Sequence, residues 1–221
     1  MGVNSKSLVY SSFNLDKELT NVDPIKALTS GKIMKDDIGK TVYISNSVAA
    51  CQEWRIADIN HDDTTGTVDL FPKYLLEDTV RPFSDGTIYY KNSNLRTWLN
   101  TTFYDGFTEE VKNAIKTQSF PSNYETLNDK VKCPSITEIG SRDSLYEACT
   151  IEEGTIYPIF GNQQSRPNDL ALYKHTNGNS NNYWTRSRCI GNDNFIINAS
   201  KNCNKSNPYY VSSAVVACIR F

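Results

Sequence analysis

Two stretches in the first third of the chain alternate between apolar and polar residues. In Glu53–Ile59, Trp54 and Ile56 fall on the same face of an extended chain, and Thr67–Phe71 follows after a polar turn. Because the side chains of a strand point alternately to its two faces, this pattern predicts a β-hairpin. The β-branched and aromatic residues of Thr41–Ser45 predict another strand before it.

Between residues 93 and 116 the apolar positions recur at helical intervals. Leu95 and Leu99 share one helical face, and Ser93 stands where an N-cap is expected. Thr108 is expected to cap a second helix, whose apolar face ends at Ile115. These positions predict two short amphipathic helices in succession.

A short strand and a single helical turn are predicted next. Lys130–Pro134 is the expected strand, and Ser135 is expected to cap a one-turn helix that Gly140 closes. From Ser141 to Asn181 the chain has little periodicity and many Asn and Gly residues. Long irregular stretches within a compact domain are uncommon and are usually functional, so we expect loops with a binding role here.

The segment Asn182–Arg188 is predicted to be a buried strand, with Trp184 and Arg186 on the same face. Asn194–Ala199 and Tyr209–Phe221 are predicted to be the terminal strands of one antiparallel sheet. A rigid aromatic strand beside a polar, turn-rich surface is typical of a binding face. No catalytic motif of comparable strength occurs elsewhere in the chain.

Residues 1–37 are predicted to be an N-terminal arm or attachment segment, because they hold too few apolar residues to fold alone. The globular domain is predicted to span residues 38–221. This division gives one large domain with an arm, which suits the length of the chain.

Positive and negative residues nearly balance, with 23 Lys and Arg against 25 Asp and Glu. No block of basic residues occurs, so we expect neither nucleic acid nor an anionic membrane surface as a partner. No apolar run is long enough to cross a bilayer, and the N-terminal residues lack the apolar core of a signal peptide. Aromatic residues make up 11% of the chain, which favours a β-rich core with much of its buried area supplied by rings.

The six cysteines form no Cys-x-x-Cys pair and no zinc-ligand spacing. Cys133, Cys149 and Cys218 stand in apolar surroundings and are expected to be small buried residues. Cys189 and Cys203 flank a polar segment and are the two cysteines to test for a disulfide bridge.

The segment from Asp58 to Asp69 has oxygen-bearing side chains at the first, third, fifth and twelfth positions of a calcium-loop pattern. Its sixth position is Asp63 instead of Gly, its last residue is Asp instead of Glu, and strands flank it. We therefore interpret it as a polar hairpin turn and predict no metal site. The two histidines, His61 and His175, lie in polar loops without a nucleophile motif nearby, so we predict no catalytic triad.

Arg96, Arg186 and Arg220 are expected to be framework residues. The fork-shaped guanidinium of arginine pairs well with carboxylates, and Glu138 and Asp129 are candidate partners. The three tryptophans are likewise expected in the core.

The joint order of several short motifs resembles a domain family of unassigned function found in phage tail and other bacterial-surface proteins. S-N-L-R-T-W-L-N begins at Ser93, D-K-V-K-C-P-S-I-T-E at Asp129 and Y-W-T-R-S at Tyr183, and the chain closes on I-R-F. The resemblance covers the chain from about Thr41 to Phe221. It implies a C-type-lectin-like fold of the α+β class, with small antiparallel sheets, two helices and long irregular loops. The family's closing G-V-R-P is replaced by A-C-I-R-F, which suggests a remodelled last strand.

Related lectin-fold proteins serve as the diversified recognition ends of phages, with variable positions rich in Asn, Ser and Tyr in the C-terminal third. The region Asn177–Tyr210, here called the apron, contains ten asparagines. We hypothesise that the apron is a recognition surface, although an AT-rich genome would also enrich asparagine. An exposed tyrosine gives a large rigid contact area at low entropic cost. The predicted ligand-binding residues are Tyr183, Asn192, Asn194, Asn204, Tyr209 and Tyr210.

The predicted function is that of a non-enzymatic phage or phage-like particle component, associated with a tail, baseplate or fibre, that recognises a bacterial surface glycan or protein. The N-terminal arm would bind other particle proteins. Copies of the chain would form a homo-oligomer on the surface of a virion or extracellular particle that is assembled in the host cytoplasm. Two alternatives remain, namely a structural decoration or cement protein and an oxidoreductase-like relative of sulfatase-activating enzymes. We predict no catalytic residue, metal or cofactor, and no membrane insertion.

Overall fold

The computed structural model describes residues 23–49, 53–76, 81–123, 125–140, 153–161, 182–188, 194–197, 203–207 and 212–221. At residues 194–197, 203–206 and 212 the backbone alone is described. Helices and strands are mixed along this part of the chain, so the predicted α+β class is confirmed.

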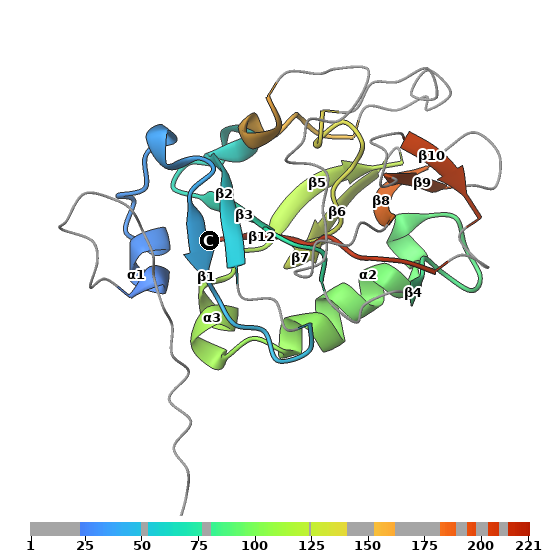
Figure 1. Cartoon of the computed structure of the whole chain (residues 1–221), viewed down its shortest axis with the longest axis horizontal. Helices are drawn as coiled ribbons and strands as arrows, with labels where there is room; N and C mark the ends of the chain where they lie inside the picture. The colour runs from blue at the N-terminus through green and yellow to red at the C-terminus, as the bar shows by residue number, and fades with distance from the viewer. Residues whose placement is uncertain are drawn as a thin grey trace, which may run out of the picture.

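A five-stranded antiparallel sheet forms the centre of the molecule (Figure 1). In spatial order its strands are β1 (Thr41–Tyr43), β2 (Glu53–Ile59), β3 (Val68–Pro72), β12 (Cys218–Arg220) and β7 (Val131–Lys132). The predicted hairpin is confirmed, because β2 pairs with β3 across the polar turn, with Ile56 opposite Leu70. A register shift after Ile56 marks a bulge in β2.

Both faces of this sheet are buried, and each faces its own apolar cluster. Trp54, Leu70 and Ile219 belong to the larger cluster, which also contains the apolar faces of the helices. Phe71 and Cys218, on the opposite face, belong to a smaller cluster. Because neither face of β3 meets solvent, all five of its residues are buried.

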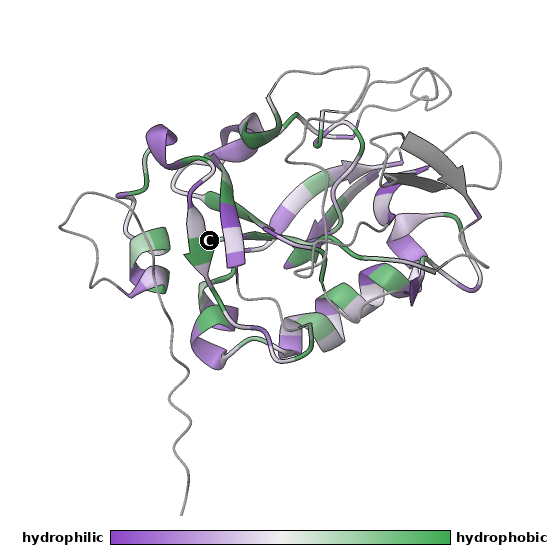
Figure 2. Ribbon diagram, viewed as in Figure 1, coloured by the Kyte–Doolittle hydropathy of each residue, from purple (hydrophilic) through white to green (hydrophobic). Residues whose placement is uncertain are grey.

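Two short helices lie below the sheet in Figure 1. α2 (Asn94–Trp98) begins at Ser93, whose Oγ accepts the backbone N–H of Arg96 at 3.1 Å, and it continues through a π-helical turn, η4 (Leu99–Phe103). α3 (Glu109–Ala114) begins at Thr108. Both predicted helices and both predicted caps are confirmed. Figure 2 shows the green and purple stripes of their amphipathic faces.

Three smaller sheets complete the described strands. They are β4 (Arg81–Pro82) with β11 (Ser212–Ser213), β5 (Gln118–Ser122) with β6 (Glu125–Asp129), and β8 (Tyr183–Arg188) with β9 (Asn194–Ile197) and β10 (Cys203–Ser206). The described residues also form four 3₁₀ turns, which are η1 (Lys35–Asp37), η2 (His61–Asp63), η3 (Tyr90–Asn92) and η6 (Pro158–Phe160).

The prediction that the last strands share one antiparallel sheet is wrong. β9 pairs with β8, whereas β11 pairs with β4 and β12 enters the central sheet between β3 and β7. Residues 213–221 are buried, and β12 is an interior strand of the largest sheet instead of an edge beside β8.

The described part of the predicted N-terminal arm packs on the domain. α1 (Pro24–Thr29) lies beside α3, and Ala27, Leu28 and Ile33 are buried in the larger cluster. The boundary drawn between residues 37 and 38 therefore does not coincide with an edge of the core. Residues 1–22 lie outside the described part of the chain.

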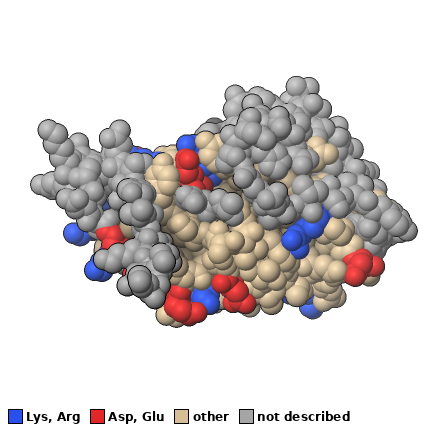
Figure 3. Space-filling model, turned by 60° about the horizontal axis from the view of Figure 1, so that its bottom comes forward, with Lys and Arg blue, Asp and Glu red and all other residues tan. Residues whose placement is uncertain are grey.

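On the face seen in Figure 3, Lys and Arg atoms lie next to Asp and Glu atoms along the lower edge, and most of the remaining described surface is uncharged. The described residues of this face form no extended patch of a single sign. None of the helices in the described ranges has the length and apolar character needed to cross a bilayer.

Candidate functional site

Strand β8 carries Trp184 and Arg186, which the sequence predicts to lie on one face of a buried strand. Trp184 is 0% exposed and Arg186 is 1% exposed, so the predicted buried strand is confirmed. Trp184 donates its backbone N–H to the carbonyl oxygen of Ala214 and its indole N–H to that of Arg81, at 3.1 and 2.8 Å. These bonds tie β8 to both strands of the β4–β11 sheet.

Arg186 and Glu138 form a buried ion pair with two parallel hydrogen bonds. Nη1 donates to Oε2 at 2.6 Å, and Nη2 donates to Oε1 at 2.8 Å. The guanidinium also donates to the backbone carbonyl oxygens of Cys133 and Glu153, at 2.8 and 3.1 Å. Lys132 adds a second positive charge, because its Nζ donates to Glu138 Oε1 at 2.7 Å. Arg186 is therefore a framework residue as predicted, and its partner is Glu138, one of the two candidate carboxylates.

The charges in this network stabilise one another. Burial by itself raises the pKa of Glu138, but Arg186 and Lys132 more than offset that effect, so the pKa lies well below its usual range. Burial likewise lowers the pKa of Arg186, and Glu138 reverses the effect, so the net shift is upward. Both groups therefore remain ionised at neutral pH although neither is in contact with solvent.

The chain around Glu138 folds into a turn that fixes its carboxylate. The Glu138 N–H donates to Ser135 Oγ, and the Ser135 N–H donates to Glu138 Oε2, each at 3.0 Å. The predicted cap is therefore confirmed as a reciprocal capping box, but residues 136–140 form a turn instead of a one-turn helix. Ser135 Oγ donates in addition to the carbonyl oxygen of Glu153, which joins the turn to the chain that returns after residue 152.

Glu153 is a buried carboxylate that the sequence analysis missed. Ser187 Oγ donates to its Oε2 at 2.7 Å, and the backbone N–H of Asn123 donates to its Oε1 at 2.9 Å. Burial raises the pKa of Glu153. Gly154 follows with φ of +89°, and a Cβ atom there would lie 2.9 Å from Glu138 Oε1. The Glu-Gly pair is the single sequence signal at this position.

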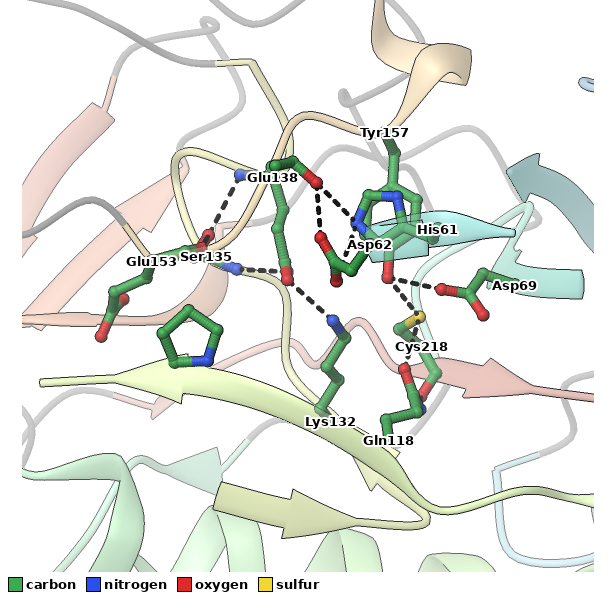
Figure 4. Close-up of polar contacts among 12 residues, drawn as sticks. His61, Asp62, Asp69, Gln118, Lys132, Ser135, Glu138, Glu153, Tyr157 and Cys218 are labelled. Atoms are coloured by element: carbon green, nitrogen blue, oxygen red, sulfur yellow. Dashed lines mark hydrogen bonds and ion pairs between the residues drawn. The ribbon is translucent and has the colours of Figure 1, made fainter. Parts of the chain in front are cut away.

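Tyr157 lies near Lys132 and Glu138 and is hydrogen-bonded to Asp69 (Figure 4), the carboxylate of a second buried ion pair. Its hydroxyl donates to Asp69 Oδ2 at 2.9 Å, and Arg220 Nη2 donates to the same oxygen at 2.7 Å. Burial and the Asp69 carboxylate raise the pKa of Tyr157 well above its usual range. Lys132 Nζ lies 5.3 Å from the centre of the Tyr157 ring, so the two networks meet at this side chain. Arg220 is a framework residue as predicted, with Asp69 as its partner.

His61 is not in an open polar loop as expected, because only 2% of its surface is exposed. Its ring stacks on Tyr157 with the ring centres 3.7 Å apart. Nδ1 lies 2.8 Å from Asp58 Oδ2, and Nε2 lies 3.3 Å from Thr155 Oγ1. Thr155 Oγ1 makes its shortest contact, 2.6 Å, with Asp62 Oδ1.

Asp58, His61 and Thr155 follow one another as the members of a catalytic triad do, but their hydrogen bonds do not suit nucleophile activation. A general base must accept the hydroxyl hydrogen of the nucleophile. Thr155 donates that hydrogen to Asp62 instead, which leaves an oxygen lone pair facing His61. The group therefore acts as a cross-link between the β2–β3 turn and residues 153–157.

The two described buried thiols are poor candidates for redox or nucleophilic chemistry. Cys133 and Cys218 are free and fully buried, as predicted. Burial raises the pKa of the Cys133 thiol far above its usual range and that of Cys218 to about 12. Since the thiolate is the reactive form, both thiols are held in their unreactive state at neutral pH. Cys149 and Cys189 lie outside the described residues, and only the backbone of Cys203 is described, so the proposed bridge is not tested.

The oxygens of the calcium-like segment are largely engaged within the protein. Asn60 Oδ1 accepts the backbone N–H groups of Gly66 and Thr67, and Asp69 is paired with Arg220. Across the described ranges, no three His, Cys, Asp or Glu side chains are grouped so as to hold a metal ion. The hairpin turn in which these residues lie was predicted, and it is present.

The sequence profile of a family described as a domain of unknown function, DUF6273, matches residues 65–219. The chain belongs to this family. No curated protein and no solved structure matches it. The DUF6273 region contains the motifs that begin at Ser93, Asp129 and Tyr183, whereas Asp58 and His61 precede it.

The motif residues of the DUF6273 region have framework roles. Arg96 donates three hydrogen bonds to the carboxylate of Asp129, the other candidate partner, at 2.7 to 3.1 Å. Asn100 accepts the backbone N–H groups of Lys130 and Val131 and donates to the carbonyl oxygen of Val131. Because these side chains bind one another or the backbone, a ligand site in the DUF6273 domain has to be formed by other residues.

Of the predicted ligand-binding residues, Tyr183 is the one whose side chain is described. The expectation that it is exposed is wrong, because it is 1% exposed and packs in the smaller apolar cluster. Both faces of β8 are covered at this point, since Tyr183 and Trp184 point to opposite faces and both are buried. Asn194 and Asn204 lie in β9 and β10, where the backbone alone is described. Asn192, Tyr209 and Tyr210 lie outside the described residues, as does the irregular stretch 162–181.

Proposed function

We propose that this DUF6273 chain is a non-enzymatic component of a phage or phage-like particle that binds a bacterial surface ligand through its C-terminal polar segments. The observation that carries the proposal is that the charged side chains of the framework already bind one another inside the domain. The motif side chains Arg96, Arg186 and Glu138 are each bound to a partner of opposite charge inside the domain. Such a framework resembles that of recognition domains, in which a rigid scaffold presents variable loops.

The arrangement of the described elements supports separate binding roles for the two ends of the molecule. α1 lies at one end of the long axis in Figure 1, and β8, β9 and β10 lie at the opposite end. The predicted attachment segment, residues 1–37, includes α1, and the apron includes β8, β9 and β10. An arm that binds the particle and an apron that binds the host would therefore face away from each other.

The proposed fold is C-type-lectin-like, and the proposed location is the surface of a virion or extracellular particle. The two helices α2 and α3 and the several small antiparallel sheets support that fold assignment. A homo-oligomer on the particle would present many copies of one weak site, and the avidity of such an array can exceed the single-site affinity by orders of magnitude.

Binding of the purified full chain to whole bacterial cells tests this function. We expect saturable binding that falls about tenfold or more when Tyr209 and Tyr210 are both replaced by Ala, because aromatic anchors carry much of the energy of such contacts. Periodate treatment of the cells would remove binding to a glycan, and protease treatment would remove binding to a protein.

The matched control is Met34→Ala, since Met34 is 64% exposed in the segment between α1 and β1 and should not affect binding. A chain that binds no cells in a broad bacterial panel, or binds equally well without Tyr209 and Tyr210, would count against recognition by the apron. The first result would favour a decoration protein.

A further inference from the structure

Arg81 differs from the framework arginines because it has no carboxylate partner in the described part of the chain. It lies in β4, directly opposite Ser213 of β11. Its guanidinium is stacked on the indole of Trp98, 3.8 Å from the ring centre. The side chain is half-buried, and burial lowers the pKa of Arg81 without an opposing acidic group. Among the described residues, this positive charge is partly removed from solvent and has no acidic partner.

Two polar atoms at this position lack a hydrogen-bond partner among the described residues. They are Arg81 Nε and Ser213 Oγ, both buried, and Ser213 as a whole is 0% exposed. Residues directly opposite each other in an antiparallel pair project their side chains to the same side of the sheet. The Nε–H group of Arg81 and the hydroxyl of Ser213 therefore lie on the same side of the β4–β11 sheet, and neither has a hydrogen-bond partner among the described residues. Such groups are rare in folded proteins and point to a bound water, ion or ligand.

The main chain at this position is fixed by β8. The Trp184 indole N–H donates to the carbonyl oxygen of Arg81, and the Trp184 backbone N–H donates to that of Ala214, the residue after Ser213. In the sequence, Tyr209 and Tyr210 stand just before β11. The two predicted contact tyrosines are thus at most four residues from Ser213 along the chain.

We propose that Arg81 and Ser213 bind the carboxylate of an acidic sugar, such as a hexuronic acid. The proposal rests on the recognition function above and names the class of its ligand. A carboxylate pairs side-on with Nε and one Nη of arginine, and a serine hydroxyl can donate a further hydrogen bond to it. One unneutralised guanidinium matches one negative charge, which favours a carboxylate over a doubly charged phosphate.

Entry of the carboxylate requires a small movement. Nε is buried whereas the side chain as a whole is half-buried, so the guanidinium has to slide over the Trp98 ring to expose its side-on edge. Binding should therefore change the environment of the Trp98 indole as well as that of the Arg81 Nε–H group. This coupled change distinguishes binding at Arg81 from weak association elsewhere.

The test is a titration of the full ¹⁵N-labelled chain with sodium glucuronate at low ionic strength, followed by the NMR signals of arginine Nε–H and tryptophan Nε1–H groups. We expect saturable shifts of the Arg81 and Trp98 signals, and none with glucose at the same concentrations. Arg81→Lys keeps the charge but removes the fork, and it should weaken binding about tenfold or more. Ser213→Ala should weaken it by a smaller factor, because the hydroxyl adds a single hydrogen bond.

Arg55→Lys is the matched control, since Arg55 lies in β2 of the central sheet, and it should bind as the unmodified chain does. The Trp184 indole N–H signal reports whether each variant keeps its fold. Absence of a saturable shift, an equal response to glucose, or full binding by Arg81→Lys overturns the site. Acetate binding as tight as that of glucuronate overturns the assignment to a sugar.

The site and the proposed function can fail separately. If glucuronate binds at Arg81 but the chain binds no bacterial cells, the site stands and the recognition function falls. If cells are bound and Arg81→Lys binds them as well as the unmodified chain does, the function stands and the site falls.

Discussion

Arg186 lies in β8 and Arg81 in β4, and each stacks on an aromatic ring, yet their hydrogen bonding differs completely. Arg186 is fully buried above Phe120 and binds both oxygens of Glu138 together with three backbone carbonyl oxygens. Arg81 lies above Trp98, and its buried Nε has no partner in the described part of the chain. Hydrogen bonding inside the domain therefore distinguishes Arg186, a framework residue, from Arg81, for which we propose a ligand.

Replacing Glu138 is the strongest test of whether the Arg186 network stabilises the domain. Glu138→Gln would leave the buried charges of Lys132 and Arg186 without their carboxylate, and such a loss costs about 3–5 kcal/mol in other buried pairs. Urea unfolding measures the change. Glu125→Gln is the control, because Glu125 and its partner Lys91 are both exposed, and we expect a change of less than about 1 kcal/mol. A loss for Glu138→Gln as small as that of the control would show that the Arg186 network is not a stabilising framework.

The stabilising contributions of two buried carboxyl groups, Glu138 and Glu153, should change with pH in opposite directions. Glu138 has a lowered pKa, so its contribution is present above the usual value of 4.5 and is lost as the pH falls below it. Glu153 has a raised pKa, so the folded protein keeps this proton to a higher pH than the unfolded chain does. The stability that Glu153 contributes should therefore decline as the pH rises from 4.5 through its folded-state pKa.

Unfolding free energies of the unmodified chain and of Glu153→Gln, measured from pH 4 to pH 8, check this sign. The advantage of the unmodified chain over the variant should shrink as the pH rises. Parallel profiles would mean that Glu153 titrates alike in the folded and unfolded states, so its burial would have no energetic consequence.

The smallest effect on stability is expected at Arg81. Arg81→Lys keeps a positive charge near the Trp98 ring, and partly exposed cation–π contacts contribute about 0.5–1 kcal/mol. The same urea experiment should therefore show a loss within about 1 kcal/mol. If Arg81→Lys were as destabilising as Glu138→Gln, Arg81 would belong to the framework and the contrast between the two arginines would disappear.

The elements with local signals were predictable from the sequence. The caps at Ser93 and Thr108, the β2–β3 hairpin and the burial of Trp184 all depend on residues close together in the chain. The sequence also indicated that the framework arginines would bind Glu138 or Asp129, but only the fold shows that Arg186 pairs with Glu138 and Arg96 with Asp129.

The sequence-based predictions failed where the position or burial of a residue depends on segments far away in the chain. The alternation in the last strand predicts an extended chain but does not say which strand it joins, and β12 enters the central sheet between β3 and β7. Tyr183 and His61 lie in polar sequence, yet Ala214 and Tyr157 cover them from far along the chain. Glu153 has no periodic pattern around it, and its role depends on Ser187 and Asn123, which come from two other segments.

The Glu138 and Glu153 network also affects how the chain can change in evolution. It binds the residues just before and just after segment 141–152, through the Ser135 bond to Glu153 and the Tyr157 N–H bond to the Glu138 carbonyl oxygen. Closing a free loop costs entropy that grows only with the logarithm of its length, so doubling the number of residues between such fixed ends costs about 0.6 kcal/mol. The described residues on either side of segment 141–152 are held together by these bonds, so a related chain with a segment of another length can keep the same scaffold.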